Sequence, residues 1–200
     1  AFAPAALADD WLPHPADATW TYEWTDSVYN TTPTKEKVTV SETTGDTFTL
    51  AWTTADMGNA SEAPTTSGNV TFQDSAAGIL NLDWRSTPAP PKFPILCATV
   101  SLCNNSLSST MYNVIWGTRG PVLAEPLLKG TSWTSTCVAQ GDVTSQSDYV
   151  GVETVTVPAF PGPVKAAKIR SEVTQAGALG DPSGSGVRTV WWVYGVGPVK

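Results

Sequence analysis

Residues 20–24 read Trp20-Thr21-Tyr22-Glu23-Trp24, so that three aromatic side chains alternate with a threonine and a glutamate. Successive side chains of a β-strand point to opposite faces, and this alternation therefore predicts a strand with one aromatic face and one polar face. The same period of two recurs in residues 47–52, 80–84, 154–157 and 168–174. Strands with one polar face are typical of antiparallel sheets, so we expect an all-β fold.

The last apolar run differs from the others. Residues 188–194 are apolar on both faces, which predicts a strand at the centre of a sheet. Residues 15–21 and 127–134 each contain a turn followed by Trp-Thr, and this faint repeat favours two β-meanders. The only stretch of any length with helical spacing is residues 102–114, where the pattern is marginal.

Two segments do not follow the strand pattern. Residues 88–94 contain four prolines, which cannot donate ladder hydrogen bonds, and residues 95–127 show no clean alternation. We therefore expect a single β domain over residues 11–200 with a long irregular insertion at 88–128. Residues 1–10 are small and apolar before two aspartates, and are either the remnant of a leader or an apolar arm.

The composition excludes several classes of partner. The chain has 200 residues, of which 14% are charged, and its formal net charge is −7. This sign opposes binding to nucleic acid and to anionic membrane surfaces. The longest apolar runs, such as residues 190–194, are far shorter than the roughly 20 residues that span a bilayer, so no transmembrane segment is expected.

Sequence features place the protein outside the cytoplasm, either secreted or in the cell envelope. Ala6-Leu7-Ala8 fits the cleavage pattern of a secretory signal. Cys97 and Cys103 have a spacing that suits a small disulfide loop in an oxidising compartment. Three cysteines allow three single pairings, so Cys137 remains an alternative partner for either.

Catalytic motifs are scarce. The single histidine, His14, lies between two prolines, and no nucleophile elbow, phosphate loop or zinc motif occurs. We therefore expect no catalytic residue, no metal and no cofactor. The remaining enzymatic alternative is a glycoside hydrolase that uses two carboxylates. The acids available for it are Asp9, Asp10, Glu23, Asp83, Glu125, Glu153 and Glu172.

The last third of the chain carries a run of motifs: Gly130-Thr131-Ser132-Trp133, residues 151–160, residues 166–169 and the closing residues 191–200. This run resembles motifs of secreted bacterial envelope proteins and lipoproteins. Such proteins are similar to the LolA-like lipoprotein carriers, in which a strongly curved antiparallel sheet forms a half-barrel with a concave, apolar ligand-binding face. The resemblance implies the same half-barrel here.

Tryptophan is the most distinctive residue type, with nine copies. These rings either supply the mass of the core or line an apolar groove. The candidate ligand-binding residues share the aromatic faces of the expected strands. They are Trp20, Tyr22, Trp24, Phe48, Trp52, Trp84, Trp191 and Trp192.

Three functions remain at this stage. The first is a non-catalytic extracytoplasmic protein that binds a lipid-like molecule or another apolar ligand, including an apolar peptide, in an aromatic-lined groove. The second is a structural subunit of an extracellular or cell-surface assembly that self-associates through residues 1–10. The third is the carboxylate-dependent glycoside hydrolase. The sequence favours the first.

Overall fold

A computed structural model describes residues 11–26, 30–56, 66–87, 121–137, 142–176 and 186–200. One sheet contains six strands: β1 (Thr19–Asp26), β2 (Asn30–Thr44), β3 (Thr47–Asp56), β4 (Thr66–Ser75), β5 (Gly78–Thr87) and β6 (Pro121–Ala124). The other sheet contains five strands: β7 (Ser132–Cys137), β8 (Asp142–Val155), β9 (Val164–Ala176), β10 (Gly186–Val193) and β11 (Gly197–Pro198). The described residues form no helix.

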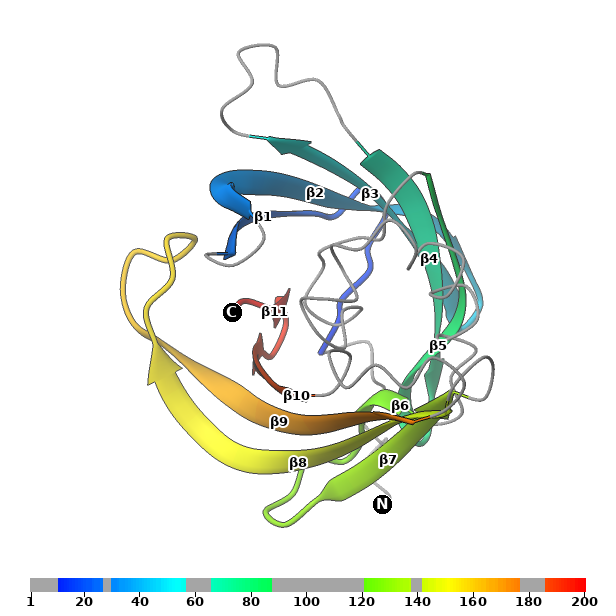
Figure 1. Cartoon of the computed structure of the whole chain (residues 1–200), viewed down its shortest axis with the longest axis vertical. Coiled ribbons are helices and arrows are strands. Elements are labelled where there is room, and N and C mark those ends of the chain that lie inside the picture. The colour runs from blue at the N-terminus through cyan, green and yellow to red at the C-terminus, as the bar shows by residue number, and fades with distance from the viewer. Residues whose placement is uncertain (1–10, 27–29, 57–65, 88–120, 138–141, 177–185) are drawn as a thin grey trace, which may run out of the picture.

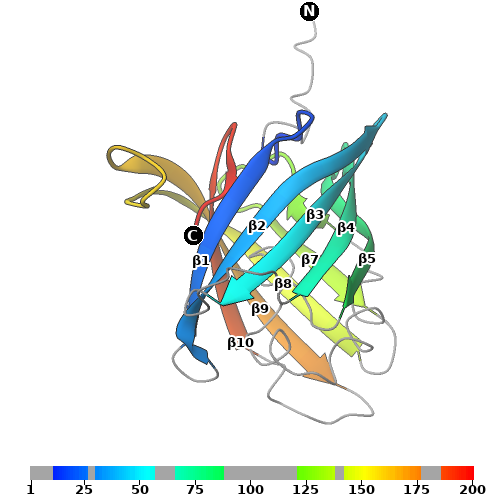
Figure 2. The ribbon, with the colours of Figure 1, turned by 90° about the horizontal axis from the view of Figure 1, so that it is seen from above.

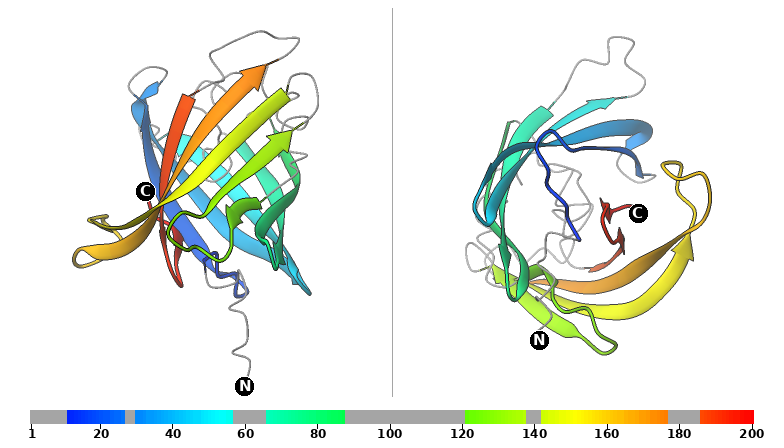
Figure 3. Two further views of the ribbon diagram at one scale, coloured as in Figure 1. Left: turned by 90° about the horizontal axis from the view of Figure 1, so that it is seen from below. Right: turned by 180° about the vertical axis from the view of Figure 1, so that it is seen from behind.

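The strands form two antiparallel meanders. The first sheet has the order β1-β2-β3-β4-β5-β6 and the second has the order β11-β10-β9-β8-β7, so within each sheet every strand pairs with its neighbours in the chain. Each sheet curls into a half-barrel, and the two half-barrels face each other around a common interior (Figures 1 and 3). Seen from above in Figure 2, the strands of the two sheets cross at an angle. The expected all-β, half-barrel fold with two meanders is confirmed.

One core joins the two sheets, because the apolar face of each meander points inward. In β3 the alternation places Phe48, Leu50 and Trp52 in the core with exposures of no more than 1%. The other core residues come from both sheets. They include Val38, Val40, Val70, Phe72, Ile79 and Leu123 of the first sheet and Trp133, Ala167, Ile169, Val190 and Trp192 of the second.

A close backbone approach holds β6 against β5. Gly78 has φ +114°, and a Cβ at this position would lie 1.9 Å from the carbonyl oxygen of Leu123. Only glycine fits there. β6 itself lies within the stretch expected as the irregular insertion, 88–128, so residues 121–124 of that stretch are strand.

Two expectations about strands need correction. β10 is not central: it pairs with β9 on one side, and on the other only with the two-residue strand β11. The last residues of the chain continue along the same edge of β10 as β11, with the amide of Trp191 donating to the Lys200 carbonyl at 2.9 Å. Leu82, which the alternation places on one apolar face with Leu80 and Trp84, is 48% exposed because it is the extra residue of a bulge opposite Thr71 and Phe72.

Candidate functional site

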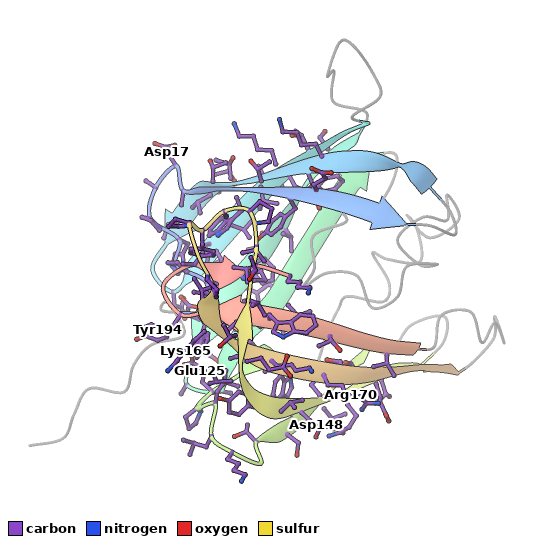
Figure 4. The ribbon with its side chains drawn as sticks, turned by 90° about the vertical axis from the view of Figure 1, so that its left-hand side faces the viewer. Asp17, Glu125, Asp148, Lys165, Arg170 and Tyr194 are labelled. Atoms are coloured by element: carbon purple, nitrogen blue, oxygen red, sulfur yellow. The ribbon has the colours of Figure 1, made fainter. Side chains whose placement is uncertain are left out.

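The two half-barrels meet at a seam between the first and last strands, where side chains, not a strand ladder, join the sheets. β1 is the end strand of the first sheet and β11 is the end strand of the second. The indole Nε1 of Trp20 donates to the carbonyl of Val196 at 2.6 Å. The hydroxyl of Tyr22 donates to the carbonyl of Pro198 at 2.9 Å. Figure 4 looks onto this side of the molecule, with Asp17 just before β1 and Tyr194 just after β10.

A pocket of about 1130 Å³ opens at this seam, and we call it the seam pocket. Ligand pockets commonly enclose roughly 300–1,000 Å³, so it is large enough for a small molecule or a short peptide. One wall is β1 with the residues before it, the second is the turn after β8, and the third is the C-terminal segment. The lining residues are Pro13, Pro15, Ala18–Glu23, Lys35, Thr156–Phe160, Gly195, Val196 and Pro198–Lys200.

The C-terminal segment can approach Trp20 because residue 197 is glycine. Gly197 has φ +109°, and a Cβ there would lie 3.3 Å from Nε1 of Trp20 and 3.4 Å from Cδ1 of Leu12. This φ favours glycine, and a Cβ would require Trp20 to shift by a few tenths of an ångström. The position of Trp20 in the pocket wall therefore depends on a residue 177 positions away in the sequence (197 − 20).

Tyr22 lies in an environment that keeps its hydroxyl protonated. It stands opposite Glu36 of β2 in the strand register, and Glu36 is fully buried. Burial raises the pKa of the Tyr22 hydroxyl well above its ordinary value of 10.0, and the negative charge of Glu36 raises it further. A protonated hydroxyl is what the hydrogen bond to Pro198 requires.

The seam pocket is apolar with a small charged rim. Three of its lining residues carry charge: Glu23, Lys35 and Lys200. Glu23 and Lys35 face each other in the β1–β2 register. The lining therefore has one net positive charge in a chain whose formal charge is −7. Its other polar side chains are Thr19, Thr21, Thr156 and Tyr22.

A second cluster of polar and aromatic groups lies on the outer face of the second sheet. Trp191 Nε1 donates to Glu153 Oε2 at 2.9 Å, and Lys168 Nζ lies 2.7 Å from Glu153 Oε1. The ammonium groups of Lys168 and Lys200 lie 5.5 and 5.1 Å from the centre of the Trp191 ring. The hydrogen bonds from Lys168 and Trp191 lower the pKa of the Glu153 carboxyl.

The six predicted ligand-binding residues whose side chains the structure describes separate into three groups. Trp20 and Tyr22 line the seam pocket, whereas Trp191 belongs to the outer cluster. Phe48, Trp52 and Trp192 lie in the core with exposures of 1%, 1% and 2%, so they supply core mass. Trp24 and Trp84 lie on β1 and β5, and their side chains are outside the described residues, as are Cys97 and Cys103.

The carboxylates considered for glycoside hydrolysis are distributed over different elements. Glu23 is in the seam pocket, and Glu153 is in the outer cluster. Glu172 of β9 forms an ion pair with Arg170 at 2.7 Å. Asp9, Asp10 and the side chain of Asp83 are outside the described residues. Glu125 follows β6 and is partly buried.

His14 is part of the packing beneath the first sheet. It is 9% exposed, and its ring stacks on Phe48 with the ring centres 3.9 Å apart. Its Nδ1 lies 3.1 Å from the carbonyl of Leu12, and its Nε2 lies 3.5 Å from Asp74 Oδ2.

Within the part of the chain that the structure describes, no three His, Cys, Asp or Glu residues gather in a way that would hold a metal ion. In the same residues, no helix has the length and hydropathy needed to cross a membrane.

The comparisons with known proteins add one structural likeness. No family model matches the chain, and no curated protein is similar to it in sequence. A solved structure described as a "putative lipoprotein" from Parabacteroides distasonis is similar over 94% of this chain and 88% of its own, with 11% identity and a TM-score of 0.44. A likeness at this level says nothing about function. The resemblance to LolA-like carriers stays a prediction.

Several pocket residues were not among the sequence-based candidates. Phe160 and Pro158 lie in the turn after β8, and Val196, Pro198 and Val199 lie in the C-terminal segment. The apolar, proline-rich turn of residues 157–163 was a usable signal, because prolines that interrupt a strand leave apolar side chains outside the ladder. No sequence pattern indicates that this turn, β1 and the C-terminus meet.

Proposed function

We propose that this protein is a non-enzymatic, extracytoplasmic binding protein that holds an apolar ligand in the seam pocket. The observation that carries the proposal is the pocket itself, in which Trp20, Tyr22 and Phe160 stand among prolines and valines. Apolar walls with few polar groups are typical of sites that bind apolar ligands. The ligand-binding region is thus narrower than the full set of aromatic residues suggested by the sequence.

The lining also favours binding over catalysis. Glu23 is the only carboxylate among the residues that line the pocket, and none of them is a histidine. A glycoside hydrolase ordinarily needs two carboxylates on either side of the scissile bond. General acid–base chemistry most often uses histidine. The seam pocket is therefore better suited to holding a ligand than to converting it.

The experiment uses N-phenyl-1-naphthylamine, an uncharged apolar fluorophore, as the probe. Its fluorescence is expected to rise on addition of the protein, and Phe160→Ala is expected to weaken binding at least about fivefold, since a buried aromatic contact is worth roughly 1 kcal/mol or more. The matched control is Val152→Ser, because Val152 is 60% exposed on β8 and is not part of the pocket. Equal binding by both variants would contradict the proposed site.

The alternative of a structural subunit that associates through residues 1–10 stays a prediction, because these residues lie outside the described part of the chain. The feature that favours it is the end strand β1, which pairs only with β2 among the described residues. An end strand of this kind is a template for an added strand.

A further inference from the structure

We infer that the ligand of the seam pocket is an extended polypeptide that pairs with β1 as an additional antiparallel strand. This inference rests on the proposed binding function and names the chemical class of the ligand. It predicts recognition by the main chain of β1 together with the aromatic side chains beside it. The argument depends on which main-chain groups of β1 face the pocket.

The strand register determines this orientation. The amide of Val40 donates to the carbonyl of Ala18 at 2.9 Å, so residue 18 turns its carbonyl toward β2. Main-chain groups alternate in direction along a strand, and residues 20 and 22 therefore also face β2. The N–H and C=O groups of Thr19, Thr21 and Glu23 then point away from β2, toward the seam. All three residues line the seam pocket.

In the part of the chain that the structure describes, no backbone hydrogen bond from another wall of the pocket reaches these six groups. Pro158 and Pro198 stand in the opposite walls, and proline has no N–H to donate. Among the described residues, no backbone hydrogen bond reaches the main chain of Thr21 or Glu23 from outside β2. A lipid tail that filled the pocket would remove water from these groups without replacing its hydrogen bonds. An extended peptide would replace them.

The side chains next to the open edge of β1 determine which residue types the peptide carries on one of its faces. In an antiparallel pair, residues directly opposite each other share a face. Peptide residues opposite Trp20 and Tyr22 would thus lie on the aromatic side of β1. The hydrogen bonds to Val196 and Pro198 hold both rings in place, so they form a fixed apolar surface. Alternate residues of the peptide should therefore be apolar.

The charged and polar residues of the pocket determine the polarity and the charge of the other face of the peptide. Thr19, Thr21 and Glu23 are exposed, and Lys35 stands opposite Glu23. With Lys200, the pocket holds two positive charges and one negative charge. The complementary peptide is polar at its second set of positions and carries one carboxylate there. Residues 19–23 extend over about 13 Å, which corresponds to a segment of roughly five or six residues.

The test uses the capped hexapeptide Thr-Val-Thr-Phe-Asp-Val and two N-methylated forms of it, with binding to the whole chain measured by titration calorimetry. The polar residues of this peptide direct their N–H groups toward β1, and the apolar residues direct theirs away. Methylation of the polar residues is expected to weaken binding at least about tenfold, because it removes donors to β1. Methylation of the apolar residues is expected to change binding by less than about twofold.

A variant of the protein tests the same interface from the other side. Thr21→Pro removes an N–H that faces the pocket and leaves the β1–β2 ladder intact, since proline is tolerated on the open side of an end strand. It should weaken binding of the hexapeptide while N-phenyl-1-naphthylamine still binds. The methylated peptides need no variant, so the test stands even if Thr21→Pro does not fold.

The possible negative results distinguish failure of the strand-addition inference from failure of the proposed binding function. If the fluorophore binds and Phe160→Ala weakens it, but the two methylated peptides behave alike, strand addition is wrong and the proposed function stands. If neither the fluorophore nor the hexapeptide binds, the proposed function fails. A dimer in sedimentation analysis that Thr21→Pro dissociates would place a second copy on this edge and overturn the assignment of a separate peptide.

Discussion

The indole Nε1 of Trp20 donates a 2.6 Å hydrogen bond to the carbonyl of Val196, which is 176 positions further along the chain. Together with the bond from Tyr22 to Pro198, it joins the first strand of one half-barrel to the last strand of the other. The two sheets thus meet at the seam through side chains, and among the described residues no strand pairs with the outer edge of β1.

The bond from Trp20 should contribute measurably to stability. Trp20→Phe keeps an aromatic ring and loses the donor, and we expect the free energy of unfolding to fall by about 1 kcal/mol more than in the control. The control is Trp133→Phe, because Nε1 of Trp133 is buried with no hydrogen-bond partner among the described residues. Urea denaturation measures both. Equal losses would mean that the bond to Val196 adds nothing.

Gly197→Ala should move the C-terminal segment away from Trp20. The added Cβ would lie 3.3 Å from Nε1 in a backbone of φ +109°, so we expect a loss of about 1–3 kcal/mol. Gly45→Ala is the matched control, since Gly45 also has a positive φ, +63°, but has nothing within 4 Å. The indole N–H resonance of Trp20 should shift only in the Gly197 variant. An unchanged resonance would contradict the crowding argument.

Tyr22 should make the protein sensitive to alkali. Its pKa is raised in the folded protein, so the folded state holds this proton more tightly than the unfolded state does. The stabilisation is complete below the ordinary pKa of about 10, and it is lost as the pH rises from there through the folded-state value.

Tyr22→Phe tests this dependence. Above pH 10 the variant should lose stability less steeply than the wild type, by up to about 1.4 kcal/mol per pH unit. Trp20→Phe keeps the hydroxyl and should retain the wild-type slope. Parallel stability curves for the wild type and Tyr22→Phe, measured by urea denaturation across pH 8–11, would rule out the proposed role of the hydroxyl.

Glu153 offers a test of the outer cluster. Its pKa is lowered by hydrogen bonds from Lys168 and Trp191, so Lys168→Met should raise it toward its ordinary value. Lys165→Met is the control, because Lys165 is an exposed residue of the same strand that does not contribute to this shift. Carboxyl carbon resonances followed during an acid titration report the pKa directly. A shift of equal size in both variants would refute the pairing with Lys168.

The strands and their inner faces were predictable because local alternation and burial agree. Phe48, Leu50 and Trp52 share a face in the sequence pattern and in the core. Leu82 shows where this reasoning fails, since a bulge depends on the partner strand and leaves no trace in the period of a single strand.

The candidate site was only partly predictable. Trp20 and Trp52 both lie on the aromatic face of an alternating run, yet one lines a pocket and the other is fully enclosed. The pattern says which residues share a face and nothing about what covers that face. That information comes from strand order and from contacts between distant segments.

The amino-acid sequence alone was enough to predict an all-β protein whose strands carry one aromatic and one polar face, because a period of two is a property of each strand by itself, and a faint repeat favoured two meanders. The tertiary structure decided that β1, the turn after β8 and the C-terminal residues enclose one pocket. The physical reason is that this pocket arises from the curvature of two sheets and from side-chain bonds such as that of Trp20 to Val196, which connect residues too far apart for any local pattern to record.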